Sequence, residues 1–258
     1  FFFKQKTAYE SLCDWSSDVC SSDLVSNSPT GNSYTISFWM RPDSMGSNNV
    51  QLVRQAYNTA LGTANVDLDL LADGSLSFGQ MQTTTAGDFH SVRSAPQAVL
   101  ASNWYHVAIV RDATNSVLGL YLNGQSVATT NTYGILSPTA TPALGFAARQ
   151  DALNNDSNTV LFKGAMDDVR VYWTALSAGE VATALSSALT KTAANSDSAL
   201  VFYAPMEGSV VNNTSDTNTV YKGSFNTSFA TNSGTITSQS TLGSPILAWA
   251  PKPIATLS

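Results

Sequence analysis

Short runs in which apolar and polar residues alternate follow one another through most of the chain. The pattern is clear in residues 34–43 (YTISFWMRPD), 50–57 (VQLVRQAY) and 66–81 (VDLDLLADGSLSFGQM). A period of two places successive side chains on opposite faces of a β-strand, so each run predicts a strand. The Asp73-Gly74 pair separates two apolar runs and predicts a hairpin turn between them.

Two further strands are predicted at residues 104–110 (WYHVAIV) and 118–122 (LGLYL), with a polar turn between them. The Asn123-Gly124 pair that follows is a strong short-range signal for a second hairpin. Residues 89–99 are poorly patterned, and we expect a loop there.

Residues 161–173 (LFKGAMDDVRVYW) predict a long strand that carries two adjacent acids on opposite faces. Alternation groups Asp167 with Val169 and Val171, and a carboxylate among aliphatic side chains needs a cation or hydrogen-bond donors. Ser177 and Glu180 then form the S-x-x-E pattern of a helix capping box. The short amphipathic helix that we expect after it has its apolar residues at Val181, Ala184, Leu185 and Leu189.

The run FKGAMDDVRVYWTALSAGEVATAL resembles the C-terminal signature of laminin-G-like domains of the concanavalin A-like lectin/glucanase superfamily. Trp104, His106, Tyr121 and the Asn123-Gly124 pair match the W-x-H-V-A and L-Y-x-N-G centre of the same family. The resemblance covers residues 25–189 and implies an all-β, two-sheet antiparallel jelly-roll sandwich. The roughly ten short strands and one short helix of the pattern suit that architecture.

The composition is typical of a secreted β-protein, because 43% of the residues are hydrophobic and only 12% are charged. A net charge of -6 argues against binding to nucleic acid or to anionic lipid. No run approaches the ~18 apolar residues of a membrane span. We therefore expect an extracellular or cell-surface protein with no nucleic-acid partner and no membrane insertion.

Residues 1–24 are excluded from the predicted fold, because DWSSDVCSSDL resembles the translation of a sequencing-library adapter. Both cysteines, Cys13 and Cys20, lie inside this segment and support no disulfide or metal site. We expect that the native N-terminus is missing.

The chain after the predicted sandwich leaves two alternatives open. Residues 190–198 (TKTAANSDS) have the composition of a linker, and residues 200–206 resemble the first strand of a laminin-G-like domain. In residues 199–258 either a second module begins, or the strand completes the first sandwich before a frayed tail. Docking is physically attractive, because an exposed sheet edge accepts an available strand.

Catalysis is not expected. The chain has three glutamates and lacks the E-x-D-x-x-E run of the glucanase branch of the superfamily. Asp67 and Asp69 share one strand face and are interpreted as part of a solvated sheet face. His106 is interpreted as a structural histidine, and Trp39, Trp104 and Tyr121 as core residues.

Two kinds of site are predicted instead. Family members often carry calcium, and the resemblance nominates Asp167 and Glu207 as its ligands; otherwise Asp167 accepts backbone N–H groups in a turn. Sugar sites combine an exposed aromatic ring with polar loop side chains. The candidates for such a site are Tyr57, Asn58, His90 with its neighbour Phe89, Tyr133, Arg149, Gln150, Asp151, Asn154, Asn155 and Asp156.

The sequence thus predicts a non-catalytic extracellular module that binds a glycan or a glycosylated surface, with structural calcium. The alternative is a structural or adhesion module of a large surface, virion or tail-fibre protein that binds a protein partner, either another copy of itself or a host surface. A third alternative is an accessory domain of a secreted hydrolase. The fold does not separate these alternatives.

Overall fold

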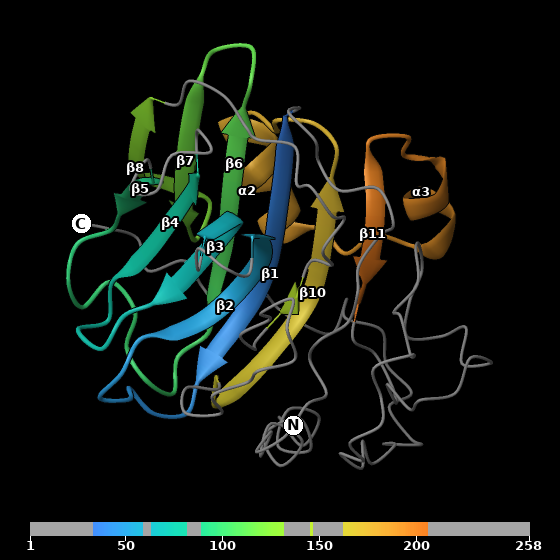
Figure 1. Ribbon diagram of the computed structural model, residues 1–258. Coiled ribbons are helices and arrows are strands. Elements are labelled where there is room, and N and C mark those ends of the chain that lie inside the picture. Colours follow the sequence, from blue (N-terminus) through green and yellow to red (C-terminus); the bar gives the residue numbers. More distant parts are fainter. Residues whose placement is uncertain (1–32, 59–62, 82–88, 132–144, 147–161, 206–258) are drawn as a thin grey trace, which may run out of the picture.

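Two antiparallel sheets pack face to face in the computed structural model, which describes residues 33–58, 63–81, 89–131, 145–146 and 162–205 (Figure 1). One sheet has the strand order β11-β10-β1-β6-β7-β8, and the other has the order β5-β4-β3-β2-β9. The predicted all-β sandwich is confirmed. The strands are β1 (Tyr34–Pro42), β2 (Val50–Asn58), β3 (Thr63–Leu70), β4 (Leu76–Met81), β5 (Phe89–Arg93), β6 (Tyr105–Asp112), β7 (Val117–Leu122), β8 (Gln125–Asn131), β9 (Gly145–Phe146), β10 (Gly164–Tyr172) and β11 (Leu200–Ala204).

One apolar core fills the space between the sheets. Ile36, Phe38 and Met40 of β1 point into it, and Leu68 and Phe78 meet them from the other sheet. All five side chains are almost completely buried, which is the main stabilising contribution of the sandwich. The alternation of each strand therefore sets which side chains face the core and which face outward.

Both predicted hairpin turns are present. Asn123 and Gly124 have φ values of 51° and 77°, the positive values of a two-residue type I′ turn between β7 and β8. Gly74, with φ of 79°, lies in the turn between β3 and β4. A Cβ on Gly74 would also lie 2.5 Å from the carbonyl oxygen of Val99, so glycine is required there.

Helix α2 (Ala178–Ser186) begins with the predicted capping box, in which Ser177 and Glu180 bond to each other's backbone N–H groups. It covers the outer face of the six-stranded sheet, where Val181 packs against Ala108 and Val110 (Figure 1). Leu189, which was expected on this helix, follows it and packs against a second cluster that contains Tyr172.

The edge of the six-stranded sheet is formed by β11, which pairs antiparallel with β10. Ala204 lies opposite Val169, and Phe202 lies opposite Val171. The sequence left two alternatives for residues 200–206. In the structure, Leu200–Ala204 pair with the first sandwich. The wider division of residues 199–258 stays a prediction.

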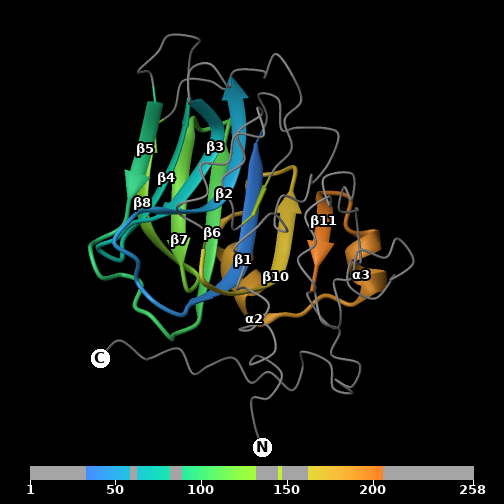
Figure 2. The same ribbon diagram turned by 60° about the horizontal axis from the view of Figure 1, so that its bottom comes forward.

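Two sequence interpretations are corrected by the secondary structure. Helix α3 (Lys191–Ser196), capped by Thr190, lies in the segment that we expected to be a linker. Figure 2 shows α3 beside β11. Strand β5 lies at the start of the segment 89–99 that we expected to be a loop.

A β-bulge at Asp168 changes the faces of β10. Asp167 lies opposite Trp39, but the next regular pair joins Arg170 to Ser37, so β10 contains one additional residue there. Asp168 has φ of 52°, and both Met166 and Val169 face the core. The prediction that Asp167 shares a face with the aliphatic residues is therefore wrong, because it lies on the outer face beside Trp39.

Candidate functional site

The outer face of the five-stranded sheet is polar. On β3, Val66, Leu68 and Leu70 point into the core, and Asp67 and Asp69 alternate with them on the outside. Cross-strand pairing aligns Asp67 with Gly79 and Asp69 with Ser77. We call this surface the polar face. It comprises Gln51, Arg54, Asp67, Asp69, Ser77, Gly79, Phe89, Ser91 and Arg93.

Asp67 is held in place by two donors on β2. Arg54 Nη1 lies 3.3 Å from Asp67 Oδ2, and Gln51 Nε2 donates to Asp67 Oδ1 at 3.4 Å. The Arg54 side chain is 5% exposed and the Asp67 side chain 16% exposed, so the pair is largely shielded from water. Both oxygens of the carboxylate are therefore oriented before any ligand arrives.

Phe89 places an aromatic ring on this surface. Among the described residues it is one of the few large apolar side chains that stay exposed, at 41%. A Cβ on Gly79 would lie 2.3 Å from Phe89 Cζ, so the ring rests against the backbone of the neighbouring strand where no side chain intervenes. The ring consequently lies close to the strand position opposite Asp67.

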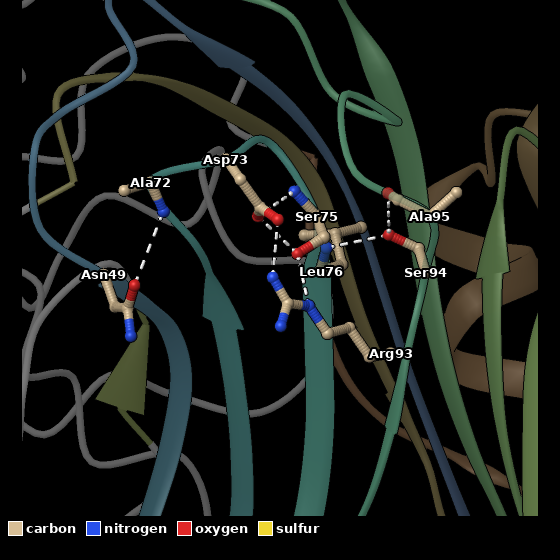
Figure 3. Close-up of polar contacts among 8 residues, drawn as sticks. All are labelled: Asn49, Ala72, Asp73, Ser75, Leu76, Arg93, Ser94 and Ala95. Carbon is tan, nitrogen blue, oxygen red and sulfur yellow. Dashed lines mark hydrogen bonds and ion pairs between the residues drawn. The ribbon is translucent and has the colours of Figure 1, made fainter.

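A hydrogen-bonded network fixes the end of the polar face at the β3–β4 turn (Figure 3). Asp73 accepts hydrogen bonds from the backbone N–H and the hydroxyl of Ser75, at 3.1 and 2.6 Å. Arg93 Nη2 donates to Asp73 at 2.6 Å, and Arg93 Nε donates to Ser75 Oγ at 2.7 Å. The Ser75 hydrogen bonds, followed by the Arg93 charge, lower the pKa of Asp73. The network ties β5 to the turn and positions Arg93.

Adjacent backbone contacts close the same turn. Leu76 N–H donates to Ser94 Oγ at 2.9 Å, and Ala72 N–H donates to Asn49 Oδ1 at 3.4 Å (Figure 3). Hydrogen bonds from neighbouring segments thus hold this end of the polar face together.

A buried ionic group lies on the outer face of the other sheet. Arg170 donates to both oxygens of Asp168, and Ser187 O accepts a further hydrogen bond from it. The guanidinium also lies 5.2 Å from the centre of the Tyr203 ring of β11. Burial alone would lower the pKa of Arg170, but the charge and hydrogen bonds of Asp168 outweigh it and raise the pKa. This group joins β10, β11 and the segment after α2, which is a structural role.

The interpretation of His106 as a structural histidine agrees with its surroundings. Its ring packs edge-on against Trp39, with ring centres 5.5 Å apart. Burial, followed by the Arg170 charge, lowers the pKa of His106 to about 3. Trp39 is buried on this outer face, while Trp104 and Tyr121 are only half-buried. The assignment to the core therefore holds for Trp39, which is buried on the outer face, and is not met by Trp104 and Tyr121.

The predicted site residues lie mostly beyond what the structure describes. His90 is half-buried on β5, and alternation places it on the side opposite Phe89. Tyr57 and Asn58 end β2, but their side chains are outside the described residues. The same holds for the whole of Tyr133, Arg149, Gln150, Asp151, Asn154, Asn155, Asp156 and Glu207.

The predicted calcium ligand Asp167 is half-buried, and its Oδ1 accepts a hydrogen bond from the Asp168 N–H at 2.9 Å. Among the described residues, no three His, Cys, Asp or Glu side chains gather as a metal site would require. The calcium site therefore stays a prediction.

Sequence reasoning missed most of the polar face. Asp67 and Asp69 were interpreted as a solvated sheet face, and the strand that carries Phe89 was expected to be a loop. The available signal was the alternation in VDLDL together with an exposed aromatic residue near the next hairpin. Their proximity depends on the pairing of β3, β4 and β5, which is a property of the fold.

A family model described as the concanavalin A-like lectin/glucanases superfamily, of laminin-G type, matches residues 16–182. The chain belongs to this superfamily. The match begins inside the segment 1–24 that is excluded from the predicted fold. No curated protein matches the chain.

Three solved structures illustrate the similarity of fold. A candidate carbohydrate-binding protein from Bacteroides ovatus has a TM-score of 0.53 and 18% identity; the match covers 72% of this chain and 48% of that protein. The CBM40 of an IT-sialidase from Ruminococcus gnavus has a TM-score of 0.50 and 18% identity, over 60% of this chain and 83% of that one. A leech intramolecular trans-sialidase has a TM-score of 0.50 and 17% identity, over 60% and 23%. This chain thus spans about half the length of the Bacteroides ovatus protein.

Proposed function

We propose that this chain is a non-catalytic glycan-binding module and that the polar face is its binding surface. The observation that carries the proposal is the exposed Phe89 ring, which rests on Gly79 beside fixed carboxylate, guanidinium and hydroxyl groups. A pyranose presents C–H groups that stack on an aromatic ring and hydroxyls that bond to polar side chains. The similarity of fold to a candidate carbohydrate-binding protein and to a CBM40 supports the proposal.

The state of the carboxylates favours binding over hydrolysis. A glycosidase needs one protonated carboxyl group as a general acid and a second carboxylate at a defined distance. Asp67 is instead paired with Arg54, and Gln51 binds its other oxygen. A carboxylate held in this way is suited to accepting hydrogen bonds from sugar hydroxyls.

The setting that we propose is extracellular, on a cell surface or in a secreted protein. The low share of charged residues supports this proposal. Neither described helix is long and apolar enough to cross a membrane. Bound calcium, with Asp167 and Glu207 as ligands, is a further part of the proposal. A chelator tests this part.

The test is a glycan array probed with the whole chain, followed by titration of the sugars that bind. Phe89→Ala should weaken binding by about tenfold or more, because aromatic side chains at the centre of a site contribute most of its energy. Leu100→Ala is the matched control, since Leu100 is 51% exposed but lies outside the polar face. It should bind like the wild type. A chelator arm shows whether bound calcium supports the site.

Two results would overturn the proposal. Absence of sugar binding with and without calcium, together with self-association, would favour the assembly alternative. Equal loss of binding in the Phe89→Ala and Leu100→Ala variants would place the site elsewhere.

A further inference from the structure

An arginine points into the interior of the sandwich near the ends of its strands. Arg111 lies near the end of β6, directly opposite Tyr34 of β1 and Leu118 of β7. Val107 and Ile109 occupy the same face of β6 and belong to the core, and the pairing continues in regular register to Arg111. Arg111 is only 3% exposed, so its side chain is enclosed between the sheets.

Within the described residues, the guanidinium of Arg111 is not matched by an acceptor. Its Nε and Nη1 atoms are buried and make no hydrogen bond there. The neighbouring carboxylate of Asp112 is directed to Asn115, whose backbone N–H and side-chain amide bind its two oxygens. Arg54 and Arg170 are the other arginines with buried side chains in the part of the chain that the structure describes, and each has an aspartate partner.

The residues nearest to Arg111 offset its charge only in part. Tyr34 is fully buried and donates to Gln80 Oε1 across the sandwich, at 3.5 Å. Burial raises the pKa of the Tyr34 phenol, so it stays neutral, and Gln80 has no charge. Burial lowers the pKa of Arg111 more than Tyr34 and Asp112 raise it, although an arginine remains protonated at any ordinary pH. A permanent cation with buried, unmatched donors is unfavourable unless an acceptor reaches it.

We propose that Arg111 binds an oxyanion, a carboxylate or a sulfate group of a small ligand, between the sheets beside Tyr34. Nε and Nη1 lie on different forked edges of the guanidinium, and both are buried without an acceptor among the described residues. A carboxylate or sulfate oxygen can accept a charge-assisted hydrogen bond from either nitrogen. This site is separate from the polar face, because Arg111 points between the sheets whereas the polar face is on the outside.

The probes are sodium acetate and sodium sulfate, each compared with sodium chloride at equal ionic strength, on the whole chain. We expect saturable binding in the millimolar range and a rise in melting temperature of about 3 to 6 °C at ten times the dissociation constant. Sulfate also stabilises proteins without binding to a specific site, so the informative quantity is the difference from Arg111→Met. The Arg111→Met variant should lose the saturable part of the rise in melting temperature. Lys163→Met, which removes an exposed cation outside the polar face, should keep it.

A second measurement does not depend on the folding of a variant. The Nε–H signal of Arg111 in a nitrogen–proton correlation spectrum of the wild type should shift during the titration, and Arg111→Lys should remove that signal for its assignment. A larger response to acetate than to sulfate would identify a carboxylate ligand, and the reverse would identify a sulfated one. Equal responses of wild type and Arg111→Met, or a stationary Nε–H signal, would overturn the proposal and leave water as the partner of Arg111.

Discussion

Arg170 donates to both carboxylate oxygens of Asp168, at 2.9 Å from Nε and 2.7 Å from Nη2. The two residues are two positions apart on the same strand and share its outer face, while the bulge at Asp168 separates Asp167 from the face of Val169. Both side chains are buried, with exposures of 2% for Arg170 and 9% for Asp168. Each charge therefore needs the other to offset the free-energy cost of its burial in the low-dielectric interior.

Asp168→Asn should destabilise the fold by about 3 kcal/mol, since it leaves a buried guanidinium without its charged partner. Asparagine tolerates the positive φ of this position, so the substitution tests the charge and not the backbone. Urea unfolding measures the effect. Asp43→Asn is the control, because the Arg41–Asp43 pair is far more exposed and should change stability by less than about 0.5 kcal/mol. A cost below about 1 kcal/mol for Asp168→Asn would contradict this account.

Phe202→Ala tests whether β11 is an integral part of the sandwich. Phe202 is fully buried in the core and lies opposite Val171. Its truncation should lower the free energy of unfolding of the whole sandwich by about 3 to 5 kcal/mol in one cooperative transition. Val201→Ala on the same strand should cost less, since Val201 is only half-buried. If Phe202→Ala instead produced a separate unfolding transition and left the main one unchanged, residues 200–204 would belong to another folding unit.

The strands and turns of the sandwich could be predicted because their signals are local. Alternation in β1 and β3, and the Asn123-Gly124 turn, are properties of neighbouring residues. The bulge at Asp168 is different, since it is defined by the register against β1 and moves Asp167 off the face of Val169. The α3 segment was mistaken for a linker because its small and polar residues give no apolar stripe; only the Thr190 cap marked it.

The candidate site was harder to predict than the fold. Phe89, Gly79 and Asp67 are on three strands, and their proximity follows from the β3–β4–β5 pairing. Strand β5 has only five residues and is exposed at alternate positions. Its sequence therefore has too few apolar residues to be distinguished from a loop. The burial of Arg170 likewise depends on Tyr203 and Ser187, residues that come later in the chain.

The burial of His106 predicts a loss of stability in acid. Its pKa is lowered to about 3 in the folded protein, mainly by burial, from 6.5 when unperturbed. As the pH falls below 6.5, His106 binds a proton in the unfolded chain, whereas in the folded chain it does not bind one until about pH 3. Stability therefore falls with pH in this window, by about 2 kcal/mol between pH 7 and pH 5 from this residue alone.

Urea unfolding at the two pH values measures this loss, and His106→Gln should reduce it by that amount. His90→Gln, at the other histidine of the chain, should leave the loss in place. A nuclear magnetic resonance titration of the wild type gives an independent reading. A His106 ring that took up a proton near pH 6 would contradict the prediction.

Gly79→Ala separates the position of the Phe89 ring from its presence. The added Cβ would lie 2.3 Å from Phe89 Cζ and 2.9 Å from Ser91 Cβ, so the ring must move away from the strand. Because an exposed side chain can turn outward, the free energy of unfolding should change by less than about 1 kcal/mol. Sugar affinity on the polar face should nevertheless fall by about tenfold, as it does when a stacking platform is displaced.

In the Phe89→Ala background the added methyl group has no ring to move, so Gly79→Ala should have little further effect on affinity. An additive loss in the double variant would show that Gly79 and Phe89 act independently, and the stacking geometry would then be wrong.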